Sequence, residues 1–554
     1  MKKLGLSLLA TIGLAGFAHA ADLPTTKAPA PAPPVNCYSS VWTWLNSTAG
    51  DCPLSYAGFT LYATIDAGIG YESNGAGFNQ WWNNGVSNII TKQSTHGPQW
   101  LWTPNGLSQS VVGIKMSEPL GSTGWSLIGT AETGFDPYGI NLAYAQKAQV
   151  QNNGKSLFLQ TANADSSRTG QPLNSQWFAG FSNPTYGTIT GGRVNTLSLD
   201  AINSYDPMGG SYAFSPVGYS GSYAGFGDTE AARANTAVKY RVDIQNFRLG
   251  GLVQVGGYNW GNGTDGIYQG QIGGDFKFPS GGILSIDGTA SFAKDAVNIG
   301  TLGSLTQCST LTKGPLKGET GCTDSVPNYY NSSDVQATLS NNTGFMLNTK
   351  YKWEAWTFYA SYQYFRQQNP SDYYQNGFES IGYFNVPGTI PGFNVPGTFA
   401  NKKLPTQWAI NNAYNIPRVA NVFWVGAKYS VPPDWMHGWG SADLTGAYYW
   451  LGQNNYNFAV ATTGPLAGVT APAACTTVVT NGTKPNGQAF SIARVSSGKC
   501  AGSTDFISFL IDWRPVKRVD IYAGVMESNV YAGLANGYFA TQTINPTAGI
   551  RIKF

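Results

Sequence analysis

The side chains that could carry covalent chemistry are few in this sequence. Downstream of residue 20 the only histidines are His96 and His437, and neither stands with a hydroxyl or thiol and an acid in a pattern typical of a nucleophile and its base. Gly261–Gly266 (GNGTDG) has the spacing of a dinucleotide-binding loop, but the next segment alternates like a strand. That loop needs a helix whose N-terminus holds the phosphate. We therefore expect a hairpin loop, no cofactor and no enzyme.

Six cysteines fall into three neighbouring pairs, which are Cys37 with Cys52, Cys308 with Cys322, and Cys475 with Cys500. Six cysteines allow fifteen pairings, and closing three short local loops is the simplest of these when strands separate the loops. In an exported protein we expect disulfides, each stabilising the fold by about 3 kcal/mol through chain entropy. No CxxC motif or histidine pairing accompanies them, so we expect no metal site.

The start of the chain has the features of a secretory signal peptide, predicted over residues 1–20. Two lysines precede an apolar run that ends in the cleavage pattern Ala18-His19-Ala20. Loss of Lys2 and Lys3 lowers the formal net charge from +3 to +1. Residues 21–34 are rich in proline, which favours an extended tether. We predict a leader over residues 21–56, which includes Cys37 and Cys52, and one main domain over residues 57–554.

The main domain alternates between apolar and polar residues with a period of two. No segment supplies the roughly 20 uninterrupted apolar residues of a membrane helix, yet 42% of the chain is hydrophobic and only 11% is charged. The last residues, Asn545–Phe554 (NPTAGIRIKF), have one apolar face and one polar face. Charges such as Asp66 and Glu132 also fall on one face of their strands. A wall with lipid outside and water inside requires this pattern.

We predict an all-β fold, a transmembrane antiparallel up-and-down β-barrel of about 16 strands with short periplasmic turns and long external loops. The predicted strands are 59–71, 111–118, 125–135, 175–182, 185–195, 234–244, 248–258, 268–278, 283–294, 345–353, 356–367, 419–431, 441–452, 504–514, 518–529 and 545–554. The predicted long loops are 73–106, 295–340, 368–417 and 453–502.

Several strand-and-turn motifs resemble those of the Gram-negative general porins. Ser110–Gly121 (SVVGIKMSEPLG) is similar to their S-R-L-G-F-K-G-S-E-D-L-G, and Pro515–Gly524 (PVKRVDIYAG) to their L-S-K-R-T-D-L-Y-A-G. Further similar segments, in the same order as in the family, are 131–135, 176–181, 186–193, 201–207, 235–240 and 549–554. The leader with its two cysteines is similar to that of α-proteobacterial porins. The resemblance implies a trimer of sixteen-stranded barrels, each with its own pore.

In such porins the third external loop folds into the lumen, and its acids face basic residues on the wall. Here that loop would run from about Thr196 to Ala232, with no Lys or Arg in it. The implied constriction residues are Asp200, Asp206, Asp228 and Glu230 on the loop, and Lys115, Arg193, Arg233 and Lys239 on the wall. Facing rings of charge orient solutes and tune ion selectivity. Because Val111 and Ser175 stand where related motifs often carry arginine, we hypothesise a weakly cation-selective or nearly neutral pore.

The sequence therefore predicts a channel for passive diffusion of ions and small hydrophilic solutes, in contact with outer-membrane lipid of a Gram-negative cell. The basic residues form no stripe that would bind nucleic acid. One alternative is a solute-specific, sugar-type channel, because aromatic side chains can stack on sugar rings, although barrels also place aromatic girdles at both interfaces. The aromatic residues in question are Trp81, Trp82, Trp100, Trp102, Tyr448, Tyr449 and Trp450. A second alternative, prompted by the expanded loops, is an adhesin or structural anchor.

Overall fold

A computed structural model describes most of the predicted main domain and the end of the leader. The described residues are 37–48, 50–73, 98–140, 142, 172–217, 233–254, 266–298, 307–310, 320–323, 335–336, 338–369, 408–409, 414–458, 480–483, 489–492, 501–533 and 541–554. The predicted signal peptide and the proline-rich tether lie outside this set. Among the described residues, no helix is long and apolar enough to span a membrane.

The main sheet is a closed barrel in which every wall strand pairs antiparallel with its neighbours in the chain. It contains 18 strands, of which β1 (Leu54–Tyr56) is a short arm and β3 and β4 are two parts of one wall strand, so the wall has sixteen strands. The wall strands are β2 (Phe59–Glu72), β3 (Gln99–Pro104) with β4 (Ser110–Pro119), β5 (Ser126–Phe135), β6 (Trp177–Asn183), β7 (Gly187–Asn195), β8 (Arg233–Ile244), β9 (Phe247–Gln254), β10 (Gly266–Lys277), β11 (Ile283–Asn298), β15 (Thr338–Trp353), β16 (Trp356–Gln368), β19 (Arg418–Ser430), β20 (Ser441–Gln453), β24 (Gly502–Val516), β25 (Val519–Ala532) and β26 (Gln542–Lys553). The predicted all-β barrel and its sixteen strands are confirmed.

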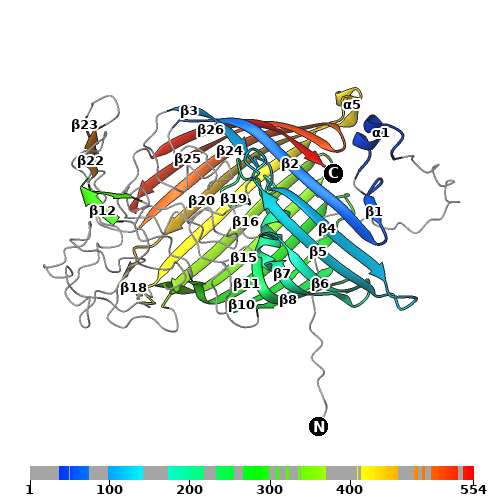
Figure 1. Cartoon of the computed structure of the whole chain (residues 1–554), viewed down its shortest axis with the longest axis horizontal. Coiled ribbons are helices and arrows are strands. Elements are labelled where there is room, and N and C mark those ends of the chain that lie inside the picture. Colours follow the sequence, from blue (N-terminus) through cyan, green and yellow to red (C-terminus); the bar gives the residue numbers. More distant parts are fainter. Residues whose placement is uncertain are drawn as a thin grey trace, which may run out of the picture.

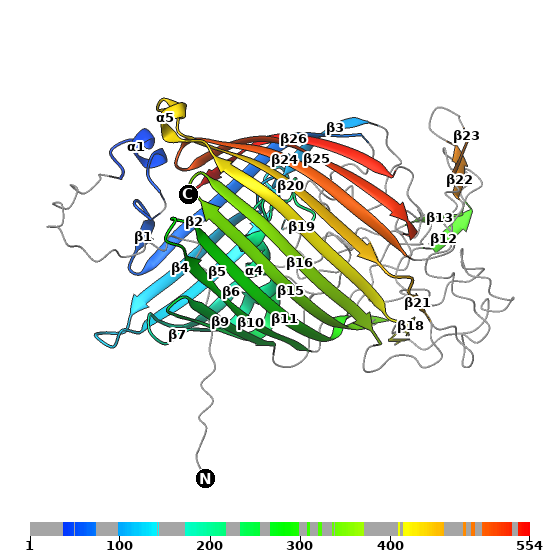
Figure 2. The same ribbon diagram turned by 180° about the vertical axis from the view of Figure 1, so that it is seen from behind.

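The barrel closes where β26 pairs with β2, from Thr64 opposite Lys553 to Gly70 opposite Thr547. The strands are strongly tilted, and the short turns lie at the same end as the C-terminus, together with α1 (Val41–Leu45) and α5 (Pro433–Met436) (Figure 1). The opposite end carries the small external pairs β12–β13 and β22–β23 (Figure 2). The predicted loop 73–106 needs a correction, because residues 99–104 form β3 and extend the second wall strand along β2.

The remaining short strands pair outside the wall. They are β12 (Gln307–Thr310) with β13 (Thr320–Thr323), β14 (Val335–Gln336) with β17 (Trp408–Ala409), β18 (Tyr414–Ile416) with β21 (Asn457–Phe458), and β22 (Thr480–Thr483) with β23 (Ala489–Ile492).

The two faces of the wall differ as the period-two pattern predicts. On β2, Leu61 and Ile69 are exposed on the outer face, whereas Asp66 is fully buried inside. Aromatic side chains ring the outside near the short turns, for example Trp125 stacked on Tyr186 and Trp356 on Phe358. Such rings suit the membrane interface, because an aromatic ring with a polar edge contacts both lipid and water.

Candidate functional site

The connection between β7 and β8 folds into the barrel, as expected for the third external loop. It begins with α4 (Leu197–Tyr205), whose cap is Thr196: the Thr196 hydroxyl accepts a hydrogen bond from Leu199 N at 3.3 Å. The wall holds the start of the helix, because the Gln269 side chain accepts from Leu197 N at 2.6 Å and donates to the Ser198 hydroxyl at 2.6 Å. Figure 2 shows α4 behind the wall strands.

Two of the predicted loop acids are described, and the structure places them differently. Asp200 forms an ion pair with Lys239 of β8, and both side chains are almost completely buried. Asp206 is buried at the end of the helix, where it accepts hydrogen bonds from Tyr449 Oη at 2.5 Å and Gly210 N at 2.7 Å. Burial raises the pKa of Asp206, and the Tyr449 hydrogen bond lowers it by less. Asp228 and Glu230 lie outside the described residues.

The other predicted wall cations do not face these acids as a ring. Arg193 is buried in the wall, where it donates to the carbonyls of Ser175 at 2.8 Å and Asn174 at 2.7 Å and to Asn235 Oδ1 at 2.6 Å. Arg233 is buried at the start of β8. Lys115 is exposed on the inward face of β4, with its ammonium 5.8 Å from the centre of the Tyr62 ring. Of the predicted cations, Lys239 is the one that the structure pairs with a described loop acid.

The inner faces of β4 and β5 carry few charges. On β5, Glu132 accepts hydrogen bonds from Tyr62 Oη at 2.9 Å and from the Ser175 hydroxyl. Val111 lies on the same inward face of β4 as Lys115, because Val112 and Ile114 point outward. One lysine and one glutamate therefore stand on the part of the wall where the family resemblance implies several basic residues.

The second half of the loop packs on an inner wall that is apolar. Phe214 and Val217 are fully buried against inward-facing residues of β15, β16, β19, β20, β24 and β25. The wall residues of this cluster are Met346, Phe365, Ala420, Val422, Trp424, Ala447, Tyr449, Leu451, Phe506, Leu510, Tyr522, Met526 and Val530. A side chain at Gly524 would have its Cβ 2.7 Å from the Phe214 ring, so glycine makes room for this contact. The loop covers an apolar surface that would otherwise face the water of the lumen.

Sequence reasoning did not find this apolar surface, because it assigned polar residues to the lumen of every strand. A signal was present: β19 and β20 are apolar on both faces, with Val422 and Trp424 inward and Phe423 and Val425 outward. Continuous apolar runs are typical of strands that are covered on both sides. Trp424 also holds the loop directly, since its Nε1 donates to the Tyr205 carbonyl at 3.1 Å.

The middle of the loop is attached to an inward bulge between β3 and β4, residues 105–109. The Gly106 carbonyl accepts hydrogen bonds from Ala213 N at 2.8 Å and from Ser211 Oγ at 2.9 Å. Asp66 fixes the bulge, because its carboxylate accepts from the backbone amides of Leu107 and Ser108, each at 2.8 Å. The described part of the loop is thus tied to the wall at its helical start and again at residues 211–213.

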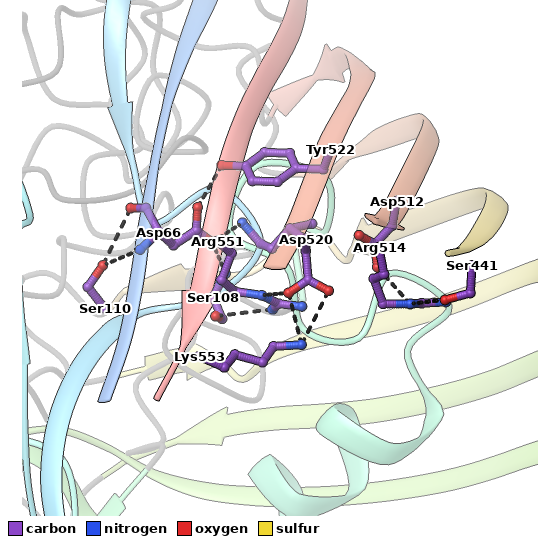
Figure 3. Close-up of polar contacts among 11 residues, drawn as sticks. Asp66, Ser108, Ser110, Ser441, Asp512, Arg514, Asp520, Tyr522, Arg551 and Lys553 are labelled. Carbon is purple, nitrogen blue, oxygen red and sulfur yellow. Dashed lines mark hydrogen bonds and ion pairs between the residues drawn. The ribbon is translucent and has the colours of Figure 1, made fainter. Parts of the chain in front are cut away.

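Figure 3 shows how Asp66 connects to a line of alternating charges on the inner wall near the short turns. Tyr522 Oη donates to Asp66 at 2.7 Å. Further along, Asp520 lies between Arg551, at 2.8 Å, and Lys553, at 2.9 Å (Figure 3).

Two more arginines of the inner wall are each surrounded by acids. Arg514 binds Asp443 at 2.8 Å and Asp512 at 3.0 Å. Across the barrel, Arg248 binds Asp287 at 2.6 Å, Asp275 at 2.8 Å and Asp243 at 3.6 Å.

The predicted Cys37–Cys52 disulfide is confirmed, with a Cα–Cα distance of 5.4 Å. The loop that it closes is docked on Arg518 of the β24–β25 turn, whose guanidinium donates to the carbonyls of Trp44 at 2.9 Å and Cys52 at 2.8 Å. For the second pair, the β12–β13 register places Cys308 opposite Cys322. A disulfide between them stays a prediction. Cys475 and Cys500 lie outside the described residues.

The described aromatic residues do not line the lumen as a platform for sugars. Trp100 and Trp102 are exposed on the outer face beside Tyr71 and Ile69. Tyr448 and Trp450 also point outward, while Tyr449 is buried under the inner loop. Trp81 and Trp82 lie outside the described residues. Within the described ranges, no group of three or more His, Cys, Asp or Glu residues could hold a metal ion.

Comparison with known proteins gave matches of two kinds. A family model for the Gram-negative porins matches residues 5–457. A search of curated proteins gave no match.

The second kind of match is with solved structures. The anion-selective porin from Comamonas acidovorans is similar, with 12% identity and a TM-score of 0.45 over 90% of this chain and 99% of that chain. OmpF of Salmonella typhi, in a complex with daunomycin, has 12% identity and a TM-score of 0.39 over 90% and 98% of the two chains. OprB of Pseudomonas putida has 8% identity and a TM-score of 0.42 over 90% and 94%.

Proposed function

The chain belongs to the Gram-negative porin family, and on that premise we propose that its third external loop forms a fixed and nearly neutral constriction. The protein is an outer-membrane channel through which ions and small hydrophilic solutes diffuse passively. The family match favours this function over an adhesin or anchor. The channel needs no covalent chemistry, and we propose that the protein is not an enzyme.

The observation that supports a fixed aperture is the attachment of the described part of the loop at two places. Gln269 and Lys239 hold the helical start, and Gly106 of the inward bulge accepts hydrogen bonds from Ser211 and Ala213. Next to this second attachment, the loop buries Phe214 against the wall. Lifting the loop would expose this apolar surface to water, which is unfavourable. A permanent constriction is therefore favoured over a mobile gate.

The charges near the loop support weak ion selectivity. The negative charge of Asp200 is balanced by Lys239, and Asp206 is buried rather than presented to the lumen. On β4 and β5, the opposite charges of Lys115 and Glu132 lie beside the same residue, Tyr62. We propose that Asp200, Lys239 and Lys115 border the constriction, together with Asp228, Glu230, Arg193 and Arg233 as the resemblance implies. We also propose a homotrimer, with residues 57–554 as one barrel domain behind a leader.

Conductance of the purified protein in a planar lipid bilayer tests this function. We expect steps in groups of three whose size scales with salt concentration, and a reversal potential near zero in a salt gradient. Persistent silence from folded protein would contradict the open pore, and a strong anion preference would contradict the neutral constriction. Saturable solute flux would instead indicate the solute-specific alternative.

A further inference from the structure

Four lysines of the inner wall stand apart from the ion-paired cations. Lys277 ends β10, Lys350 and Lys352 lie near the end of β15, and Lys428 lies near the end of β19. Among the described residues, none of the four forms an ion pair with a carboxylate, unlike Arg248 and the cations of Figure 3. Their ammonium groups are therefore not bound by a described carboxylate, whereas Arg248 and Arg514 are.

The strand faces place all four lysines toward the lumen. On β10 Gln271 is buried inside and Ile272 is exposed outside, so Lys277 shares the inner face. On β15 Asn348 is fully buried inside, and Lys350 and Lys352 share its face. On β19 Trp424 is fully buried inside, and Lys428 shares its face.

The strand register aligns three of these lysines in one row, called the basic arc here: Lys277, Lys352 and Lys428. Ile283 is opposite both Lys277 and Lys352, and Thr357 is opposite both Lys352 and Lys428. Each lysine is therefore two strands from the next, a backbone separation of about 10 Å.

Lys350 lies one step deeper, beside the inner loop. Its ammonium donates to the Ser204 carbonyl at 3.2 Å and lies 5.2 Å from the centre of the Tyr205 ring. The basic arc thus lies between the constriction and the short-turn mouth.

The acids near the basic arc are bound to arginines and not to its lysines. Asp243, Asp275 and Asp287 all lie around Arg248, which they outnumber, and Asp443 is bound to Arg514. Glu354, in the turn that follows Lys352, forms no ion pair with a described lysine. The screening length is about 8 Å at physiological ionic strength and about 30 Å at 0.01 M, so the fields of lysines about 10 Å apart add to one another mainly in dilute salt.

We propose that the basic arc is a binding site for polyvalent oxyanions, the phosphate groups of permeating solutes above all, at the periplasmic mouth. Lysine suits this role because its ammonium is a mobile point charge with three donors, able to follow an anion of variable shape. The site rests on the proposed function, since only an open lumen brings solutes to it. It is separate from the constriction, so anion binding here is compatible with weak overall ion selectivity.

The test is block of single-channel current by inorganic pyrophosphate in dilute potassium chloride. We expect block at lower pyrophosphate concentration from the short-turn side than from the loop side, and loss of block in concentrated salt. Replacing the arc with glutamine (Lys277→Gln, Lys352→Gln and Lys428→Gln together) should raise the half-blocking concentration about tenfold. The matched control is Lys517→Gln, which removes a lysine bound to Asp51 in the β24–β25 turn.

Each outcome separates the two proposals. If the protein does not conduct in plain potassium chloride, the proposed open pore fails. If it conducts but the triple variant is blocked as strongly as the wild type, or the control loses block equally, the binding site is overturned. Equal block by acetate and pyrophosphate would also overturn it, because the arc should favour multiple charge.

Discussion

The Asp200–Lys239 pair decides the charge that the helical part of the loop presents to the lumen. Both side chains are nearly out of contact with solvent, at 12% and 4% exposure, and Lys239 also donates to the Asn195 carbonyl at 2.9 Å. A buried ion pair adds little net stability, but removing one partner leaves an uncompensated charge, which costs about 3–5 kcal/mol. The pair therefore affects both the position of the loop and the ion selectivity of the pore.

Single substitutions of this pair should shift ion preference in opposite directions. Asp200→Asn leaves a positive charge and should move the reversal potential toward anions, whereas Lys239→Met should move it toward cations. Each should also lower the free energy of unfolding by about 3 kcal/mol, and the double variant should recover most of both effects. Reversal potentials and denaturant titrations of all three variants check this. Equal reversal potentials in the two single variants would contradict a place at the constriction.

Asp206 predicts a pH dependence of stability. Burial raises its pKa in the folded protein, so the folded state keeps the proton to higher pH than the unfolded state does. The resulting stability is complete below the ordinary aspartate pKa of about 3.9 and is lost as the pH rises through the folded value. Asp206→Asn lacks this titration.

The unfolding temperature of Asp206→Asn, measured relative to that of the wild type, should therefore increase as the pH rises from about 3 to about 7. Other carboxylates titrate in both proteins, so the difference between the two curves isolates Asp206. Parallel curves across this range would show that the raised pKa is not coupled to folding.

At the scale of elements, the period-two pattern located every wall strand, because one face of each must contact lipid. It missed β3 because residues 105–109 leave the wall and break the alternation between β3 and β4. The apolar inner wall around Trp424 was also missed, since only the position of the inner loop explains it. Local pattern thus predicts the wall but not what covers it.

The same limit applies to the candidate site. The family resemblance placed Asp200 on the loop and Lys239 on the wall, and the structure joins the two in an ion pair, while their place at the constriction stays a prediction. It could not show that Asp206 is turned into the apolar cluster beside Tyr449, or that Arg193 is held by backbone carbonyls. Those contacts join residues far apart in the sequence, and charge alone does not specify them.

Loosening the inner loop should change the pore itself. Phe214 is fully buried, and Phe214→Ala should remove about 3–5 kcal/mol from the docked state of the loop. We expect larger and noisier single-channel currents as the loop moves. Phe345→Ala is the matched control, because Phe345 is exposed on the outer face of β15. If the currents of Phe214→Ala were as small and as free of noise as those of the wild type, they would contradict the role of this contact.

At the scale of the whole molecule, the barrel closes at the seam between its first and last strands, β2 and β26. Here the segment closed by Cys37–Cys52 bridges that seam. β1 pairs with β2, Trp44 packs on Phe554 with ring centres 5.5 Å apart, and the carbonyl of Leu45 accepts from Arg518 N at 3.2 Å. The first strand is thereby joined to the turn before β25 and to the end of β26. The segment lies beyond the strand ends at the short-turn mouth (Figure 1).

Removal of this disulfide should weaken the barrel without changing its current. Replacing Cys37 and Cys52 by serine frees a loop of 15 residues, a loss of about 3 kcal/mol by chain entropy. We expect a lower unfolding temperature with unchanged single-channel conductance, because the lumen and inner loop keep their contacts. The comparison is the double serine variant of Cys308 and Cys322, which lie on external strands far from the seam. If that variant destabilises the barrel as much, or if loss of Cys37–Cys52 leaves unfolding unchanged, the leader segment does not hold the seam closed.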